Sequence, residues 1–174
     1  SFNETELHAL LLTSTGAQID GAWRNAIGEE AEKVVQRLLV KEVVKRDLLT
    51  AFINRTGTGM EPYDPQRLEE QLGTIGRYRG IVLANQTSIL FSSEPDVSLV
   101  GMRGDSLGVI EVKGGTDPAG ALERYGAAKK SFENTLKEYP EAKTILLASC
   151  MTPEAKERIA KDPIITKSYN LTEI

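Results

Sequence analysis

The chain has 174 residues, of which 40% are hydrophobic and 26% charged, values that are ordinary for one globular domain with its own core. No stretch of about 18 apolar residues occurs, which excludes a membrane-spanning helix. The formal net charge of −4 argues against binding a polyanion through overall charge, although a basic cleft can lie on an acidic body. It also fits a carboxylate site that a divalent metal neutralises.

The chain carries one cysteine, Cys150, and one histidine, His8. A single cysteine permits no internal disulfide, and the two residues are too few for a Cys₄ or Cys₂His₂ zinc site. The single thiol fits a reducing compartment, and the first residues lack the basic start and apolar stretch of a signal peptide. We therefore expect a cytoplasmic protein, and the sequence leaves open whether the chain is a piece of a longer one.

Helices are predicted along the N-terminal region of the chain. Residues 3–12 form a short amphipathic segment, and Asp20 suits the cap of a longer helix with apolar residues every three or four positions. These apolar residues are Ile27, Ala31, Val34, Val35 and Leu38. We expect helical character to continue through residues 41–53, until the polar segment 54–59 forms a surface loop. Asp64-Pro65 then predicts another short helix, capped by Asp64.

From residue 77 onward the hydrophobic period changes from helical to strand-like. Strands are predicted at residues 77–84, 89–100 and 107–113. The first two are separated by a turn at 85–87, and the last two by the glycine-containing segment 101–106. This region of the chain therefore predicts three successive strands.

Helices and strands alternate in the remaining sequence. A helix is predicted at residues 118–139, and the continuous apolar run 144–149 is typical of a strand buried on both faces. Thr152-Pro153-Glu154 has the cap, first-turn proline and first-turn acid of a helix start. Residues 164–174 alternate loosely and predict a last strand.

The order of these elements indicates an α/β or α+β fold, with a central mixed sheet flanked by helices on both faces. We expect one domain that comprises residues 1–174. Residues 1–75 are expected to form a helical N-terminal region, and residues 76–174 to form the sheet-bearing core.

One predicted hairpin carries most of the chemistry. Folding the strands about Arg103-Gly104 places Asp96 opposite Glu111 and Val97 opposite Ile110. Side chains alternate along strands, so this register puts the apolar pair on one face and both acids on the other. Lys113 shares the face of Glu111, and a slip by one residue would destroy the separation.

Two carboxylates on facing residues have Cβ atoms about 5 Å apart and repel each other, unless a cation lies between them. Oxygen ligands without a histidine or cysteine cluster favour Mg²⁺, or Mn²⁺ in its place. Beside such a metal, Lys113 can orient an attacking water or stabilise charge growing on a phosphoryl group. The arrangement therefore predicts phosphodiester hydrolysis, and the sequence leaves open whether one metal or two are used.

Pro95-Asp96 followed by Glu111-Val112-Lys113 resembles the motif of the PD-(D/E)XK nuclease superfamily. That superfamily includes type II restriction endonucleases, junction resolvases and repair nucleases. Its common core is a helix, three antiparallel strands, a helix and a further strand, which is the order predicted here between Asp20 and Ser149. The continuation from Lys113 through the segment 114–132 is most similar to a restriction-type member.

The resemblance implies a role for each residue of the motif. Asp96 and Glu111 are expected to be metal ligands with the carbonyl of Val112, and Lys113 to be catalytic. Many members also carry an acid on the first helix in a Gly-x-x-x-Glu pattern, which Gly28 to Glu32 matches. Glu30 borders the same apolar stripe, so the choice between Glu32 and Glu30 stays open.

The function that the resemblance implies is a Mg²⁺-dependent endodeoxyribonuclease acting on double-stranded DNA, with a type II restriction enzyme as first choice and a homodimer as the natural assembly. The expected phosphate contacts are Lys129, Lys130, Arg124 and Arg103, although exposed lysines on a helix often serve only solubility.

Three alternatives remain open at this point. The closest is a repair or junction-resolving nuclease of the same fold. The others are a non-catalytic DNA-binding module that retains the fold, and an unrelated metal-dependent phosphoesterase.

Overall fold

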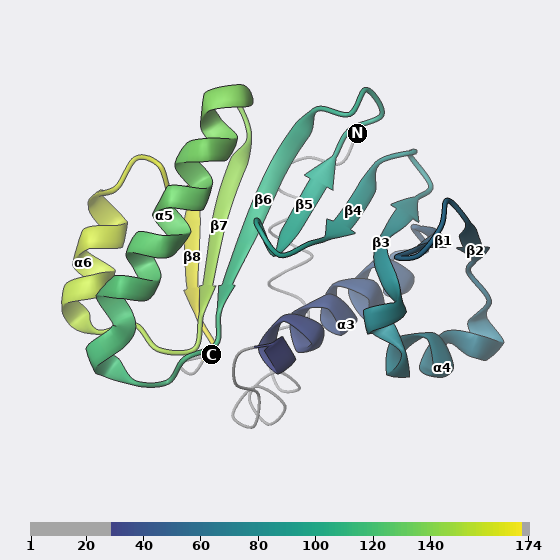
Figure 1. The fold of residues 1–174 in the computed structure, drawn as a ribbon, viewed down its shortest axis with the longest axis horizontal. Coiled ribbons are helices and arrows are strands. Elements are labelled where there is room, and N and C mark those ends of the chain that lie inside the picture. Colours follow the sequence, from purple (N-terminus) through teal and green to yellow (C-terminus); the bar gives the residue numbers. More distant parts are fainter. Residues whose placement is uncertain (1–28, 172–174) are drawn as a thin grey trace.

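The computed structural model describes residues 29–171 of the protein, which form a mixed sheet with helices packed against it (Figure 1). The predictions for residues 3–12 and for the cap Asp20 lie outside the described residues. Within these residues the α-helices are α3 (Glu29–Lys45), α4 (Leu68–Gly73), α5 (Ala121–Glu138) and α6 (Pro153–Lys161), and short 3-10 helices cover Pro65–Arg67, Ile75–Arg77 and Pro118–Gly120. The strands are β1 (Leu49–Asn54), β2 (Met60–Pro62), β3 (Tyr78–Leu83), β4 (Ser88–Phe91), β5 (Val97–Val100), β6 (Ser106–Lys113), β7 (Lys143–Ala148) and β8 (Lys167–Asn170).

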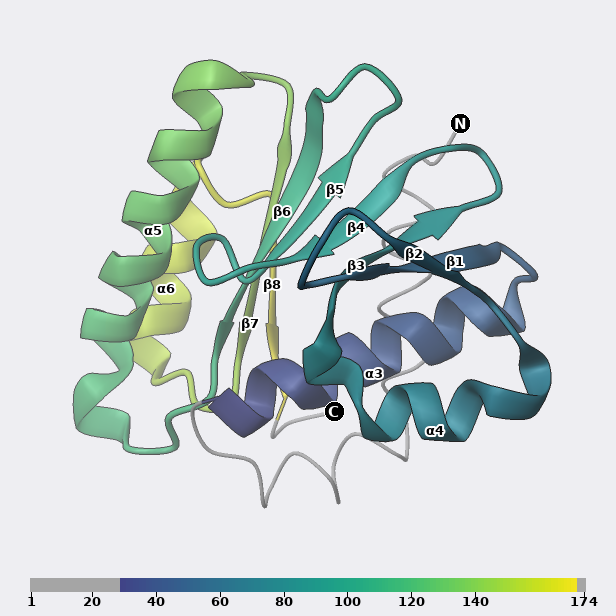
Figure 2. The ribbon, with the colours of Figure 1, turned by 45° about the vertical axis from the view of Figure 1, so that its right-hand side comes forward.

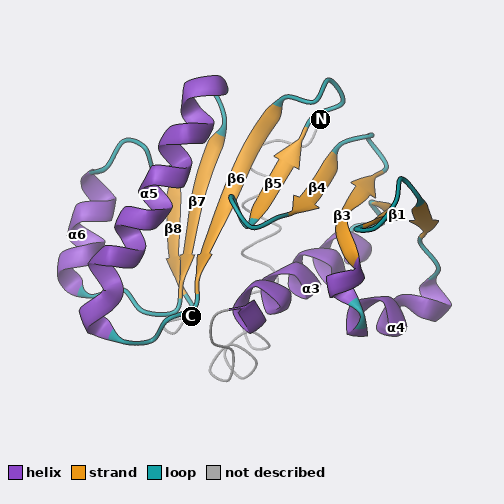
Figure 3. Cartoon of the chain, viewed as in Figure 1, coloured by secondary structure: helices purple, strands orange, loops and turns teal. Residues whose placement is uncertain are grey.

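The eight strands form one sheet in the order β2-β1-β3-β4-β5-β6-β7-β8. Neighbouring strands from β2 to β6 pair antiparallel, whereas β6, β7 and β8 pair parallel. Each parallel pair is joined by a helix, α5 for the first and α6 for the second, as a parallel connection requires (Figure 3). The predicted mixed sheet in an α+β protein is therefore confirmed.

The two faces of the sheet carry different helices (Figure 2). Ile110 and Val112 of β6 belong to the larger apolar cluster, which contains the buried side chains of α3. Val109, on the opposite face of β6, belongs to a second cluster with Phe132 of α5 and Ile159 of α6. Because side chains alternate along a strand, Glu111 lies on the face of Val109, beneath α5.

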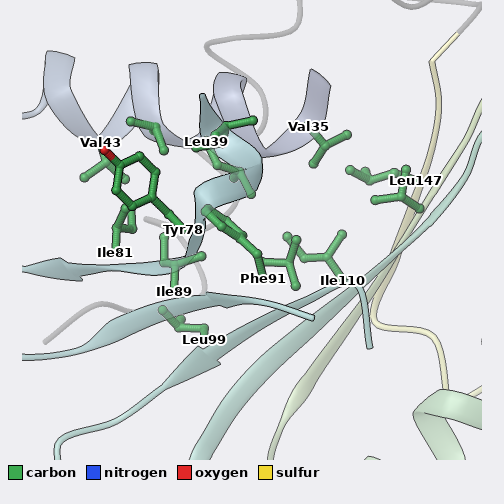
Figure 4. Packing of buried hydrophobic residues seen from close by; sticks show 14 of the residues in the cluster. Val35, Leu39, Val43, Tyr78, Ile81, Ile89, Phe91, Leu99, Ile110 and Leu147 are labelled. Carbon is green, nitrogen blue, oxygen red and sulfur yellow. The ribbon is translucent and has the colours of Figure 1, made fainter. Parts of the chain in front are cut away.

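The larger cluster forms the main core. Figure 4 shows Val35, Leu39 and Val43 of α3 above the inward side chains of the sheet, among them Phe91 of β4 and Leu147 of β7. The predicted strand at 144–149 is confirmed as β7, whose residues after Lys143 are buried on both faces. The hairpin strand β6 is therefore held rigidly between two layers of helices.

The chain after α3 departs from the prediction. Helical character was expected through residue 53, but α3 ends at Lys45 and β1 begins at Leu49. Asp47 takes a positive φ of 56°, and the N–H groups of Asp47 and Leu48 donate to the carbonyls of Val44 and Val43. This is the Schellman pattern that ends helices, here with aspartate in the left-handed position usually held by glycine. The N-terminal region that was expected to be helical thus contains β1 and β2.

The predicted strand at 89–100 is wrong as a single element, because it is divided into β4 and β5. The Ser92 N–H donates to the Asp96 carbonyl, and the Ser92 hydroxyl donates to the Pro95 carbonyl, which closes a tight connection. The Glu94-Pro95 peptide bond in this connection is cis. The sheet accordingly turns back immediately before Asp96.

Most other elements agree with the sequence analysis. The helix starts at Asp64 and Thr152 are confirmed, since their side chains accept hydrogen bonds from the N–H groups of Gln66 and Ala155. The strand predicted at 164–174 is confirmed in part as the shorter β8. None of the helices within residues 29–171 is long and apolar enough to cross a lipid bilayer.

Candidate active site

The hairpin of β5 and β6 has the register predicted from the sequence over Val97 to Leu99, and the register shifts by one residue at Val100, which pairs with Ser106. Val97 pairs with Ile110 and Ser98 with Val109. The connecting turn contains Gly104 at a φ of 83°, a backbone conformation that glycine adopts without strain. Asp96 directly precedes β5, so the same register carries it to the position opposite Glu111.

Three ionisable side chains converge on the α5 face of this hairpin. The Lys113 Nζ lies 2.5 Å from Glu111 Oε2 and 3.6 Å from Asp96 Oδ2. The three come from the start of β5 and the end of β6, which the antiparallel pairing brings to one end of the sheet. The structure therefore places the predicted trio together, around one ammonium group.

A backbone interaction holds Asp96 in place. The Val112 N–H donates to Asp96 Oδ2 at 2.6 Å. The carbonyl of Lys113 accepts from the Ser149 N–H beyond β7, and successive peptide groups of a strand point to opposite edges. The carbonyl of Val112 is therefore directed toward the β5 edge, on the side of Asp96.

Both carboxylates are almost completely buried, with 4% of Asp96 and 3% of Glu111 exposed. Burial raises the pKa of Asp96, and the charge of Glu32 adds to the rise, against the Val112 N–H and Lys113. Burial likewise raises the pKa of Glu111, with a contribution from Asp96 and opposition from Lys113. Two acids share one amine here, so ionising both leaves one negative charge unbalanced, which contributes to the raised pKa of each acid.

Burial by itself would lower the pKa of Lys113, but its hydrogen bond to Glu111 and the charges of both acids outweigh that effect. The net result is a raised pKa, so the amine stays protonated at neutral pH. About a fifth of its side chain, 22%, remains exposed. Lys113 is therefore the member of the trio that solvent reaches most easily.

Ser131 of α5 was not among the site residues predicted from the sequence, and its hydroxyl lies close enough to Glu111 to lower the pKa of that carboxyl. No hydrogen bond of normal geometry joins them, and both Ser131 Oγ and Glu111 Oε1 are buried without a partner among the described residues. The two groups are therefore neighbours, and Glu111 Oε1 is a buried oxygen without a hydrogen-bond donor among the described residues.

The two candidate helix acids differ in their surroundings. Glu32 is half-buried near the start of α3, and its charge raises the pKa of Asp96. Glu30 is exposed and forms an ion pair with Lys33 at 2.6 Å. Electrostatic proximity to Asp96 favours Glu32 over Glu30.

Two of the basic residues expected to contact phosphate have internal partners. The Lys129 Nζ lies 2.8 Å from Asp162 Oδ2, a buried carboxylate that also accepts from the Tyr125 hydroxyl. The Arg124 Nη2 donates to the carbonyl of Asp117. A Cβ atom on Gly115 would lie 2.8 Å from the guanidinium of Arg124, so the loop after β6 lies directly against that group. Lys129 therefore joins α5 to the end of α6, and Arg124 joins α5 to the loop after β6.

The remaining two predicted contacts, Lys130 and Arg103, are exposed. Lys130 lies on α5, next to Ser131. Arg103 lies in the hairpin turn, at the opposite end of β6 from Lys113. The length of β6, Ser106 to Lys113, corresponds to roughly 23 Å of extended chain. The structure therefore does not bring Arg103 to the trio.

The sequence matches no protein-family model and no curated protein. Within residues 29–171, no three aspartate, glutamate, histidine or cysteine side chains form a ready-made metal cluster.

Proposed function

We propose that the protein is a Mg²⁺-dependent endonuclease that hydrolyses phosphodiester bonds of double-stranded DNA. The observation that supports this most directly is the convergence of Asp96, Glu111 and Lys113 on one face of a hairpin. The ammonium contacts one acid and lies near the other. A plain structural sheet gains nothing from placing two acids together at a buried position.

The residues present fit a hard divalent cation. Asp96 and Glu111 supply carboxylate oxygens, the Val112 carbonyl points to the same edge, and Glu111 Oε1 is buried without another partner among the described residues. When bound there, Mg²⁺ would polarise the scissile phosphate and lower the pKa of a bound water. Mn²⁺ has the same ligand preference and is expected to substitute.

Lys113 has a different role in this proposal. Its raised pKa keeps the amine protonated, so it is suited to stabilise negative charge on a phosphate oxygen or to orient water, and not to accept a proton. Glu111 holds the amine through a hydrogen bond of 2.5 Å. The Val112 N–H fixes Asp96 beside it.

Within this class we favour a type II restriction endonuclease, which would act as a homodimer on a symmetric site. A repair or junction-resolving nuclease uses the same chemistry and differs in the DNA that it recognises. A non-catalytic DNA-binding module would not need the buried trio. We place the enzyme in the cytoplasm within the same proposal.

The test is cleavage of mixed plasmid and phage DNA with Mg²⁺ and with chelator. Asp96→Ala and Lys113→Ala are compared with Glu157→Ala, which removes an exposed carboxylate paired with Lys161 on α6. Discrete fragments formed only with metal, and lost in the first two variants alone, support a restriction enzyme. Cleavage at the parent rate in either of those variants would mean that this trio is not the active site.

A further inference from the structure

A groove runs along α5 over the same sheet face that carries the trio. Its volume of about 390 Å³ is in the range of small-molecule sites. Its floor includes Ser98 and Val109, one pair of the hairpin register, and its wall is the C-terminal half of α5. Pro95 and Ser131 line the groove at the end next to Asp96 and Glu111. The groove thus begins beside the candidate active site, although none of the trio lines it.

Two buried hydroxyl groups in the lining have no partner among the described residues. Ser131 Oγ lies at the end next to the trio, and Ser106 Oγ lies toward the hairpin turn. Buried polar atoms in folded proteins are nearly always hydrogen-bonded, so an unpaired hydroxyl at each end of one groove needs an explanation. A polar occupant that spans the groove would supply both partners.

The charges of the lining restrict that occupant. Glu94 and Glu138 contribute carboxylates, and the lining residues, all within the described chain, include no lysine or arginine. A phosphate is therefore disfavoured inside the groove, whereas a neutral group with several donors and acceptors fits. The amide of Asn134 can pair with both kinds of atom, and the ring of Tyr139 offers a surface on which a base can stack.

The position relative to the trio gives the register of the occupant. Val109 precedes Lys113 by four residues on β6, a step of about 13 Å. A short single strand can cross this step, with one phosphate at Lys113 and the sugar and base of a neighbouring nucleotide in the groove. A base inside a duplex cannot enter a groove walled by a helix, so the base must be unpaired or rotated out of the stack.

We propose that the groove binds one unpaired nucleoside of the nucleic acid strand whose phosphate lies at the trio, through Ser106, Ser131 and Asn134. The proposal rests on the proposed function, since it takes the trio as the phosphate site. It adds a preference for DNA with an unpaired or readily extruded nucleotide.

The test measures binding without cleavage, in chelator, with two labelled duplexes that differ by a single-nucleotide bulge. We expect the full chain to bind the bulged duplex about tenfold more tightly than the paired one, the size expected for a few hydrogen bonds. The double variant Ser106→Ala/Asn134→Ala should lose most of that preference. Ser88→Ala removes a half-buried serine hydroxyl of β4 outside the groove and should keep it.

The double variant is expected to fold, because the Ser106 hydroxyl makes no hydrogen bond within the described residues of the free protein. A fluorescent 2-aminopurine placed in the bulge gives a second measurement. Its emission should change on binding to the parent protein and to Ser88→Ala, and much less on binding to the double variant.

Equal affinity for the two duplexes would overturn the groove proposal, as would a preference that survives in the double variant or no binding to either duplex. Cleavage that depends on Asp96 and Lys113 but shows no bulge preference would leave the nuclease standing and remove the groove proposal. A preference for the bulged duplex that is lost in the double variant, without any cleavage, would support the groove proposal and contradict the nuclease.

Discussion

The backbone N–H of Val112 donates a 2.6 Å hydrogen bond to the side chain of Asp96. The paired residues of β5 and β6 end with Val97 and Ile110, so this side chain continues the pairing by one further bond. The same carboxylate lies 3.6 Å from the ammonium of Lys113. Asp96 therefore links the end of the hairpin to the charged site, and its structural and chemical roles can be separated by substitution.

Asp96→Asn keeps an oxygen acceptor for the Val112 N–H and removes the charge. We expect this variant to fold with nearly the parent Tm and to lose metal-dependent cleavage. Asp96→Ala leaves a buried N–H without a partner and should lose about 1–3 kcal/mol of the free energy of unfolding. Urea denaturation beside a plasmid cleavage assay measures both effects. Cleavage by Asp96→Asn at the parent rate would contradict the role given to this carboxylate.

Glu111→Gln should stabilise the metal-free protein at neutral pH, by on the order of 1 kcal/mol, because it relieves the repulsion between two buried acids that share one amine. A carboxyl with a raised folded pKa binds more protons in the folded than in the unfolded state. Stability therefore falls as pH rises from the unfolded pKa of about 4.3 through the folded pKa. The advantage of the glutamine variant should grow over that window and vanish at lower pH.

Mg²⁺ should reverse the order of stability of the parent protein and Glu111→Gln. The parent protein should gain about 2.7 kcal/mol at a concentration one hundred times its Kd, whereas the glutamine variant should gain little. Thermal unfolding across pH, with metal and with chelator, gives all four values. An equal Mg²⁺ effect on both proteins would place the metal elsewhere.

Lys113→Ala should reduce cleavage by about two to three orders of magnitude, the usual loss when one charge-stabilising donor is removed. It also leaves two buried acids without their shared cation, so stability should fall as well, most strongly at pH values above the raised pKa of the two acids. Lys113→Arg keeps the charge and should recover stability more than activity, since the planar guanidinium cannot take the same position. Single-turnover rates and Tm values distinguish these outcomes.

The hairpin was predictable because Val97, Ile110 and the two acids tolerate one register only. The strand β1 was not, because Leu49, Phe52 and Ile53 are spaced by three and four residues and fit a helix equally well. The helix ends before this segment because Asp47 adopts a left-handed backbone conformation, and an aspartate at this position does not by itself predict that conformation. The division of 89–100 likewise depends on contacts of Ser92 with Pro95 and Asp96.

Some of the candidate site could have been found from spacing alone. Ser131 is a polar residue on the apolar side of its helix, between Ala128 and Phe132, and such an exception to the pattern is a usable signal. Arg103 could have been set aside in the same way, since the register that joins Asp96 to Glu111 puts the hairpin turn at the far end of β6. The pairing of Lys129 with Asp162 had no such signal, because it joins two residues far apart in sequence.

The helix acid can be tested with a matched pair of variants. Glu32→Gln should weaken metal-dependent cleavage, because Glu32 is close enough to Asp96 to raise its pKa. Glu30→Gln removes the same charge two residues away, at an exposed position paired with Lys33, and should leave cleavage near the parent level. The Mg²⁺ concentration that gives half-maximal rate is the measurement. A larger effect at Glu30 would transfer the role to that residue.

Substitutions of the two adjacent lysines of α5, Lys129 and Lys130, should have different effects. Lys129→Ala breaks an ion pair to a buried carboxylate and should reduce stability, whereas Lys130→Ala removes an exposed charge and should leave Tm unchanged. Hydrogen bonds from Lys129 and Tyr125 outweigh burial and hold the pKa of Asp162 below its usual value. The stability that these hydrogen bonds provide is therefore present above the unfolded pKa of about 3.9, and it is lost as pH falls through the folded pKa.

If Lys130 contacts a DNA phosphate, Lys130→Ala should weaken binding about equally for all sequences and reduce the slope of log Kd against log salt by about one. An unchanged slope would leave Lys130 with a role in solubility only.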